Sequence, residues 1–215
     1  MNDLGPLAVL GMGRGSAELI DFLHETSPGS QLTVLDDRWP AVPEQFLGHP
    51  VEGKLDRARQ LVGGGHRVAL GIANESRPGI RREIGVRLGL PEAAWLTYAH
   101  PSARVSKTAH VGAGTVVYPG AQVAVNAKVG RWALLYFNAV VHHDALVGDG
   151  AVLCAGVLLA GNVIVGDGAY LGIGAVVKQE VRIGSGALVG AGAVVTEDVP
   201  DGAVVAGVPA RALPR

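Results

Sequence analysis

A strict six-residue repeat constrains the second half of this chain more than any other feature. From residue 105 to residue 195 a branched aliphatic residue returns at every sixth position, sixteen times without a break. These residues are Val105, Val111, Val117, Val123, Val129, Leu135, Val141, Val147, Leu153, Leu159, Val165, Leu171, Val177, Ile183, Val189 and Val195. Two places before each of them stands Ala in most repeats, and three places after it usually stands Gly, Asn or Asp. The latter residues tolerate the left-handed backbone conformation of a tight corner.

The repeat predicts a solenoid of short parallel strands. One unit of six residues describes one strand and one turn, and three units close a triangular coil. Sixteen units make a little over five coils, in which each aliphatic residue stacks on the one 18 residues earlier. A right-handed β-helix or propeller blades have period lengths that this sequence does not show. Residues 100–215 are therefore predicted to form an all-β domain with a continuous aliphatic core.

The first half alternates apolar runs with helical patterns, which is typical of a parallel α/β sheet. Strands are predicted at Leu7–Leu10, Leu32–Leu35, 68–72 and 95–98, a helix at 17–24, helical character in the Arg-rich segment 77–87, and loops at 48–53 and 63–65. We assign residues 1–99 to a Rossmann-like domain, with His100 and Pro101 at the boundary.

The glycine-rich turn after the first strand has three interpretations. Gly11, Gly13 and Ser16 partly match the dinucleotide-binding fingerprint, with Asp36 at a suitable distance. A helix N-terminus also suits the diphosphate of a nucleotide sugar. The third interpretation is a tight turn without a ligand. Asp36 and Asp37, at the end of the second strand, either bind a ribose or base or cap the next element.

His142, His143 and Asp144 interrupt the corner pattern of the repeat. A histidine accepts a proton from an attacking amine or hydroxyl near neutral pH, and an adjacent carboxylate orients it. Polar residues at a solvent-facing corner are the alternative, and a zinc site that includes His110 is a further one. Metal ligands must converge on one point, whereas neighbouring side chains generally diverge, so we expect no metal.

Charge and composition exclude other classes of function. The chain has 18 Lys and Arg against 19 Asp and Glu, so we expect no nucleic acid or anionic membrane as partner. The single Cys154 forms no internal disulfide, and the sequence carries neither a secretion signal nor a transmembrane run. We expect a cytoplasmic protein, in which Cys154 is a small structural residue.

The whole chain resembles the sialic acid acetyltransferase group of hexapeptide-repeat acyltransferases, which includes bacterial enzymes that acetylate UDP- or GDP-linked 4-amino sugars. The matching segments follow the family's order and are Leu10–Gly13, Leu35–Asp37, His100–Ala103, Val141–Asp144, Leu159–Val163, Gly190–Val195 and Gly207–Arg211. The resemblance implies a left-handed parallel β-helix and a homotrimer with sites between subunits. It also implies direct transfer from acetyl-CoA to the amino group of a nucleotide-linked sugar.

The resemblance further implies roles for particular residues. His143 is the expected general base, Asp144 supports it, and the backbone amide of Gly161 polarises the thioester carbonyl. Acetyl-CoA is expected near Val152, Gly161, Ile173 and Ala191. The nucleotide sugar is expected at Gly13, Arg14 and Gly15, with Asp36 and Asp37.

Three positions depart from the family's usual residues, and two other functions compete with N-acetylation. The departures are Ser16 with Ala17 in the first turn, Tyr136 in place of Asn, and Val152 in place of His. O-acetylation of a sugar hydroxyl keeps the same chemistry with another acceptor. A nicotinamide-dependent oxidoreductase would use the first half of the chain, but it leaves residues 103–198 without a role.

Overall fold

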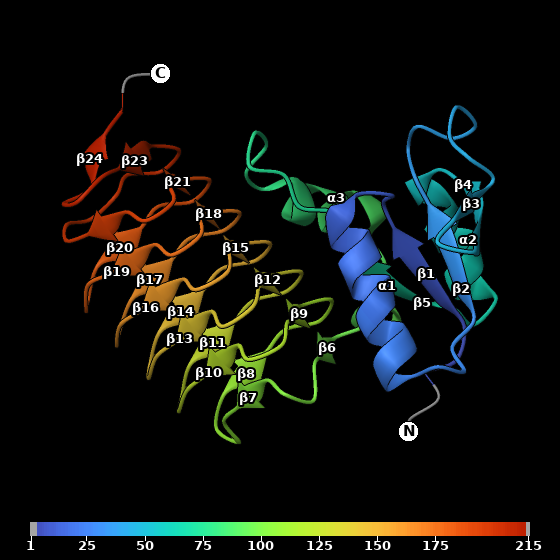
Figure 1. Cartoon of the computed structure of the whole chain (residues 1–215), viewed down its shortest axis with the longest axis horizontal. Helices are drawn as coiled ribbons and strands as arrows, with labels where there is room; N and C mark the ends of the chain where they lie inside the picture. Colours follow the sequence, from blue (N-terminus) through green and yellow to red (C-terminus); the bar gives the residue numbers. More distant parts are fainter. Residues whose placement is uncertain (1–3, 214–215) are drawn as a thin grey trace. The chain divides into compact units, whose positions relative to one another are not determined.

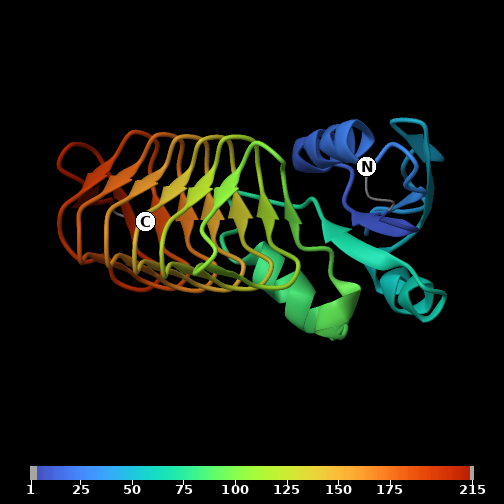
Figure 2. The ribbon, with the colours of Figure 1, turned by 90° about the horizontal axis from the view of Figure 1, so that it is seen from below.

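The computed structural model describes residues 4–213 and divides into two compact units (Figures 1 and 2). The first unit contains the residues through Ala73 together with Ile84–Thr97. The second contains Asn74–Glu83 together with the chain from Tyr98 onward. By these contacts Asn74–Glu83 belongs to the second unit, although the sequence places it in the segment 1–99; that domain boundary stays a prediction.

The first unit is built on a mostly parallel five-stranded sheet in the order β3-β4-β2-β1-β5. Its strands are β1 (Leu7–Leu10), β2 (Leu32–Leu35), β3 (Gln45–Phe46), β4 (His49–Gly53) and β5 (Arg67–Leu70). Its helical segments are α1 (Arg14–Thr26), η1 (Leu55–Arg57), α2 (Ala58–Gly63) and η2 (Glu92–Ala94), and the boundary between the units passes through α3 (Ile80–Leu88). All four residues of β1 are buried, as expected for a central parallel strand. The predicted strands β1, β2 and β5 and the helix α1 are confirmed.

Two predictions for the first half were wrong. The predicted loop 48–53 contains β4, whose Val51 and Gly53 are buried and pair with β2. The sequence suggests a loop because Pro50 and the flanking glycines are typical of turns. In the structure Pro50 faces the short edge strand β3, a position in a sheet where proline is tolerated. The predicted strand 95–98 is also absent: Trp95 makes only an isolated bridge to Val68.

The end of that run, Tyr98–Ala99, instead begins the solenoid. Tyr98 pairs with Val116, 18 residues later, and so continues the repeat one strand further towards the N-terminus. The pairing of a two-residue strand is decided by the partner available to it, which a local pattern does not reveal.

The second unit is a β-helix with three sheets, here called faces, whose neighbouring strands from β6 to β22 are parallel and lie 18 residues apart in sequence (Figure 2). Face 1 contains β7 (Arg104–Val105), β10 (Gln122–Val123), β13 (Val140–Val141), β16 (Leu158–Leu159), β19 (Val176–Val177) and β22 (Val194–Val195). Face 2 contains β8 (His110–Val111), β11 (Lys128–Val129), β14 (Leu146–Val147), β17 (Ile164–Val165) and β20 (Arg182–Ile183). Face 3 contains β6 (Tyr98–Ala99), β9 (Val116–Val117), β12 (Leu134–Leu135), β15 (Val152–Leu153), β18 (Tyr170–Leu171), β21 (Leu188–Val189), β23 (Val204–Ala206) and β24 (Arg211–Ala212), the last of them antiparallel.

The repeated aliphatic residues form the core of the β-helix, as predicted. All of them are buried except Val105 and Val111, which belong to the first strand of face 1 and of face 2 and so have no coil beneath them. The Ala residues two places earlier are fully buried from Ala121 onward. Burying one Val or Leu side chain contributes roughly 1.5–3 kcal/mol, so the stacked repeat accounts for much of the stability of this unit.

The corners have the backbone conformation that the repeat predicts. The third residue after the aliphatic one has a positive φ at every corner from Gly114 to Gly192. Trp132 and Glu180 also adopt it, although neither favours that conformation. We call the turns after faces 1, 2 and 3 the first, second and third corner; residues 142–145 are one turn of the first corner.

Arg81 anchors the segment Asn74–Glu83 to the second corner of the β-helix. The side chain is fully buried, and its guanidinium donates hydrogen bonds to the carbonyls of Trp132 and Ala133. Burial lowers the pKa of Arg81 to about 10, while nearby Tyr118 and Tyr136 act in the opposite direction. The group is therefore cationic at neutral pH, and its removal would take a charged donor away from two backbone carbonyls.

We expect Arg81→Ala to lower the free energy of unfolding by about 3 kcal/mol, because buried acceptors lose a charged donor. Urea denaturation measures the change. Arg82→Ala is the matched control, since the Arg82 side chain forms an exposed ion pair with Asp167 at 3.2 Å, for which about 0–1 kcal/mol is expected. Equal effects of the two substitutions would contradict the anchoring role.

Candidate active site

The first corner brings His143 and Asp144 into direct contact. His143 Nδ1 and Asp144 Oδ2 are 2.9 Å apart, and both side chains are partly open to solvent, at 39% and 46%. Asp144 occupies the corner position with positive φ, and its backbone N–H donates to the carbonyl of Val125 in the preceding coil. With Asp144 Oδ2 on Nδ1, the other ring nitrogen, Nε2, is left to accept a proton.

Gly161 lies against the imidazole of His143, one coil further along. A Cβ atom at Gly161 would lie 2.5 Å from Cε1 and 2.6 Å from Nε2 of His143, so the ring rests on bare backbone. The carbonyl of Gly161 accepts a hydrogen bond from the N–H of Glu180. Within the described part of the chain the N–H of Gly161 makes no hydrogen bond.

Asn126 holds the second oxygen of the Asp144 carboxylate. Its side-chain amide donates to Asp144 Oδ1 at 3.1 Å, and its own N–H donates to the hydroxyl of Thr108. The hydrogen bond with His143, followed by that from Asn126, lowers the pKa of Asp144. The carboxylate is therefore ionised at neutral pH, and this hydrogen-bonded state is lost only as the pH falls through the lowered pKa. From the sequence Asn126 was interpreted only as a turn residue. Its position 18 residues before Asp144, one coil earlier, could have indicated that the two side chains are neighbours.

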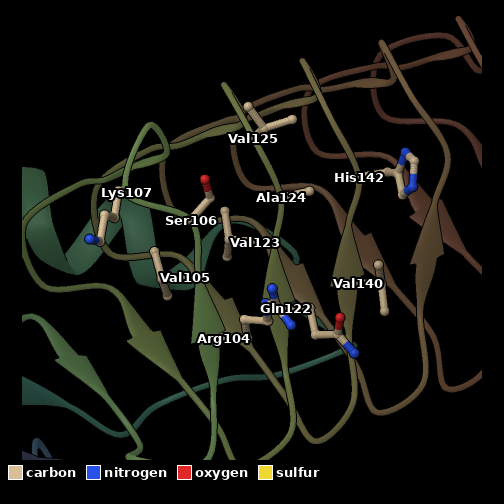
Figure 3. Close-up of a pocket in the computed structure, with 10 residues that line it drawn as sticks. All are labelled: Arg104, Val105, Ser106, Lys107, Gln122, Val123, Ala124, Val125, Val140 and His142. Atoms are coloured by element: carbon tan, nitrogen blue, oxygen red, sulfur yellow. The ribbon is translucent and has the colours of Figure 1, made fainter.

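Two grooves flank this corner of the β-helix. The first, here called the basic groove, has a volume of about 630 Å³, and its lining includes Arg104, Ser106, Lys107, Gln122, Val123 and His142 (Figure 3). The second, of about 410 Å³, lies on the side of face 2 and is lined by Thr108, Asn126, Lys128, Asp144 and Leu146. Sequence reasoning identified neither groove.

The residues predicted to hold the coenzyme do not gather around His143 within one chain. Ile173 is 64% exposed, and Ala191 is exposed on the next coil of the third corner. The third and first corners are the opposite edges of face 1. Val152 points outward from face 3, where its side chain is buried. Gly161 is the one of these four residues that lies against His143, and the coenzyme contacts of all four stay predictions.

The residues predicted to bind the sugar nucleotide lie in the first unit. Gly13 is the N-cap of α1, without a capping side chain, and Arg14 and Gly15 begin that helix. Asp36 accepts hydrogen bonds from the N–H of Met12 and from the guanidinium of Arg38. The Arg38 side chain is the main cause of a lowered pKa at Asp36.

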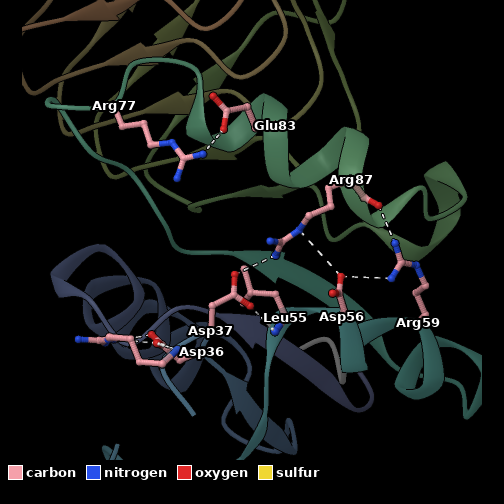
Figure 4. A network of polar contacts seen from close by, with 9 residues as sticks. Asp36, Asp37, Leu55, Asp56, Arg59, Arg77, Glu83 and Arg87 are labelled. Atoms are coloured by element: carbon pink, nitrogen blue, oxygen red, sulfur yellow. Dashed lines mark hydrogen bonds and ion pairs between the residues drawn. The ribbon is translucent and has the colours of Figure 1, made fainter. Parts of the chain in front are cut away.

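The carboxylate of Asp37 is also hydrogen-bonded within the first unit. It accepts hydrogen bonds from the N–H of Leu55 and from Arg87, each close to 3 Å (Figure 4). Both carboxylates thus stabilise the turn and its neighbours, and their contact with a ligand stays a prediction.

The departure from the family at Ser16 has a structural explanation. Ser16 is fully buried, its hydroxyl donates to the carbonyl of Leu10, and a Cβ on Gly71 would lie within 2.6 Å of its Cα. The side chain at this position therefore faces the interior of the unit. Tyr136 packs against Tyr118, with ring centroids 4.8 Å apart.

By their chemistry, the remaining His, Cys, Asp and Glu side chains of the described chain are candidate metal ligands or nucleophiles. Among residues 4–213 no group of three or more His, Cys, Asp or Glu side chains converges as metal ligands would. His142 packs against His143 with ring centroids 4.6 Å apart. Cys154 is buried, and burial raises the pKa of its thiol. No helix in the described chain has the length and apolar character that a membrane span requires.

Two solved structures resemble the chain over nearly its whole length. PerB from Caulobacter crescentus, in complex with CoA and GDP-perosamine, is 30% identical with a TM-score of 0.85, over 98% of each chain. The acetyltransferase domain of PglB from Neisseria gonorrhoeae FA1090 is 33% identical with a TM-score of 0.83, over 97% of this chain and 99% of that one. The chain belongs to the hexapeptide-repeat transferase family.

Further similarities agree with this hexapeptide-repeat transferase assignment. The family model described as bacterial transferase hexapeptide (six repeats) matches residues 162–197. UDP-N-acetylbacillosamine N-acetyltransferase from Bacillus subtilis (strain 168) is 32% identical over 114 residues, which are 52% of this chain and about half (50%) of that relative. The parallel sheets of this hexapeptide-repeat transferase are consistent with a left-handed β-helix acetyltransferase fold.

Proposed function

We propose that the chain transfers an acetyl group from acetyl-CoA to the amino group of a nucleotide-linked amino sugar. The observation that carries the proposal is the hydrogen-bonded pair of His143 and Asp144, resting on the bare backbone of Gly161. The names of the similar proteins support it: one was solved with CoA and GDP-perosamine, and another with acetyl coenzyme A. A variant of perosamine N-acetyltransferase from Caulobacter crescentus, in which a histidine is replaced by asparagine, was also solved with CoA and GDP-perosamine.

In the proposed reaction the sugar amine attacks the thioester carbonyl directly. His143 Nε2 takes a proton from the attacking nitrogen, while Asp144 holds the imidazole through Nδ1. The N–H of Gly161 donates to the carbonyl oxygen as negative charge develops there. The C–S bond then breaks, and the coenzyme leaves as a thiolate that receives the proton from His143.

We also propose a homotrimer whose sites lie between subunits. Ile173 and Ala191 lie at the edge of face 1 opposite to that of His143. One coenzyme molecule can contact residues of both kinds if it lies between the first corner of one copy and the third corner of another copy. For the first unit we propose a Rossmann-like fold that holds the nucleotide with Gly13–Gly15, Asp36 and Asp37.

A panel of acceptors tests the proposed function. Release of free CoA thiol is measured with acetyl-CoA and either GDP- or UDP-linked amino sugars or hydroxyl sugars such as sialic acid. We expect turnover with at least one nucleotide-linked amino sugar. Turnover only with hydroxyl acceptors would replace N-acetylation by O-acetylation, and no turnover with any of them would refute the proposal.

Asn126 is expected to matter because it fixes the carboxylate that supports the base. We expect Asn126→Gly to lower kcat by about tenfold, in line with other supporting hydrogen-bond partners, with little change in the KM for acetyl-CoA. Glycine suits the positive φ of this residue. Asn138→Gly is the matched control, because Asn138 has the same backbone conformation at the third corner. Equal kcat values for the two variants would contradict this role.

A further inference from the structure

The basic groove at the first corner of the β-helix carries positive charge, and no carboxylate is among its lining residues. Arg104 and Lys107 are both exposed, and within the described chain neither forms an ion pair. The imidazole of His142 also lines the groove. A concave site of this size, with apolar side chains and two exposed cations in its lining, is suited to an anionic small molecule.

The distance between the coil that carries the two cations and the coil that carries His143 matches the distance between a reacting sugar amine and its diphosphate. Arg104, Gln122 and Val140 stand side by side on three neighbouring strands of face 1 (Figure 3). Two strand spacings, about 10 Å, therefore separate the coil of Arg104 and Lys107 from the coil that carries His142 and His143. A ligand whose reacting group lies at His143 extends across one sugar ring to reach the two cations.

We infer that the basic groove is a diphosphate-binding site, in which Arg104 and Lys107 are the principal phosphate contacts. Arginine binds phosphate oxygens through two parallel hydrogen bonds, and lysine adds a mobile point charge. Gln122, between them and His142, offers an uncharged donor to the bridging part of the ligand. The inference rests on the proposed function, because the two substrates of that reaction, the nucleotide sugar and acetyl-CoA, both contain a diphosphate.

The test uses the variants Arg104→Gln and Lys107→Gln, singly and together. The KM of each substrate is measured separately, because the loss of a charged hydrogen bond is expected to raise KM by about tenfold or more. A rise for the nucleotide sugar alone assigns the site to its diphosphate, and a rise for acetyl-CoA alone assigns it to the coenzyme. Arg182→Gln is the control, since this exposed arginine lies on face 2, outside the groove.

Inorganic pyrophosphate provides a readout that does not depend on turnover. We expect calorimetric titration to detect pyrophosphate binding to the full-length protein and to Arg182→Gln, and to lose it in the double variant. Unchanged KM values for both substrates, or equal pyrophosphate binding by all variants, would overturn the inference. If the proposed function itself were wrong, the unmodified protein would show no acetyl transfer, whereas the pyrophosphate titration would still report on the groove.

Discussion

Alanine in place of His143 is expected to lower kcat for acetyl transfer at neutral pH by about 10²–10⁴-fold, the usual contribution of a positioned general base. The reason is geometric: Asp144 Oδ2 sits 2.9 Å from Nδ1, so the lost imidazole is the one oriented proton acceptor of the pair. The KM for acetyl-CoA should change little, because proton transfer develops only in the transition state. Steady-state kinetics with the acceptor identified by the panel measure both constants.

His110→Ala is the control for this substitution. His110 is exposed on β8 of face 2 and lines neither groove, so the control should keep the full kcat. A His143→Ala enzyme with kcat within about threefold of the unmodified protein would remove the base from the mechanism, since catalysis by a positioned base is worth far more.

Gly161→Ala is expected to lower kcat by about 10²-fold, because displacement of a catalytic group by about 1 Å has that effect. A methyl group at this position would lie 2.5–2.6 Å from the imidazole, so the ring must move away. The backbone of Gly161 does not have a positive φ, and the displaced group is the end of an exposed side chain. The free energy of unfolding should therefore stay nearly unchanged.

Gln179→Ala is the matched control for Gly161→Ala. Gln179 is the exposed residue at the same corner position one coil later, so its truncation leaves the imidazole in place. The double variant His143→Ala/Gly161→Ala should lose no more activity than His143→Ala alone, since both changes act on the same base. Additive losses would mean that the added methyl group disturbs the site by a route other than the displaced ring.

The architecture of the second unit was predictable because its information is local and repeated. Inward side chains, small neighbours and corner residues recur every six residues, and each recurrence constrains the same backbone. The first unit was less predictable. β4 and the start of the solenoid at Tyr98–Ala99 depend on partners far along the chain, and no period marks them.

The candidate site divides in the same way. The sequence by itself determined the coil of 18 residues, the corner that carries His143 and Asp144, and the aliphatic core, because a side-chain period specifies which residues face inward. Only the tertiary structure decided that Gly161 supports the imidazole, that Asn126 holds the carboxylate and that Arg104 and Lys107 line one groove. These contacts join neighbouring coils, where the direction of each side chain depends on the packing around it.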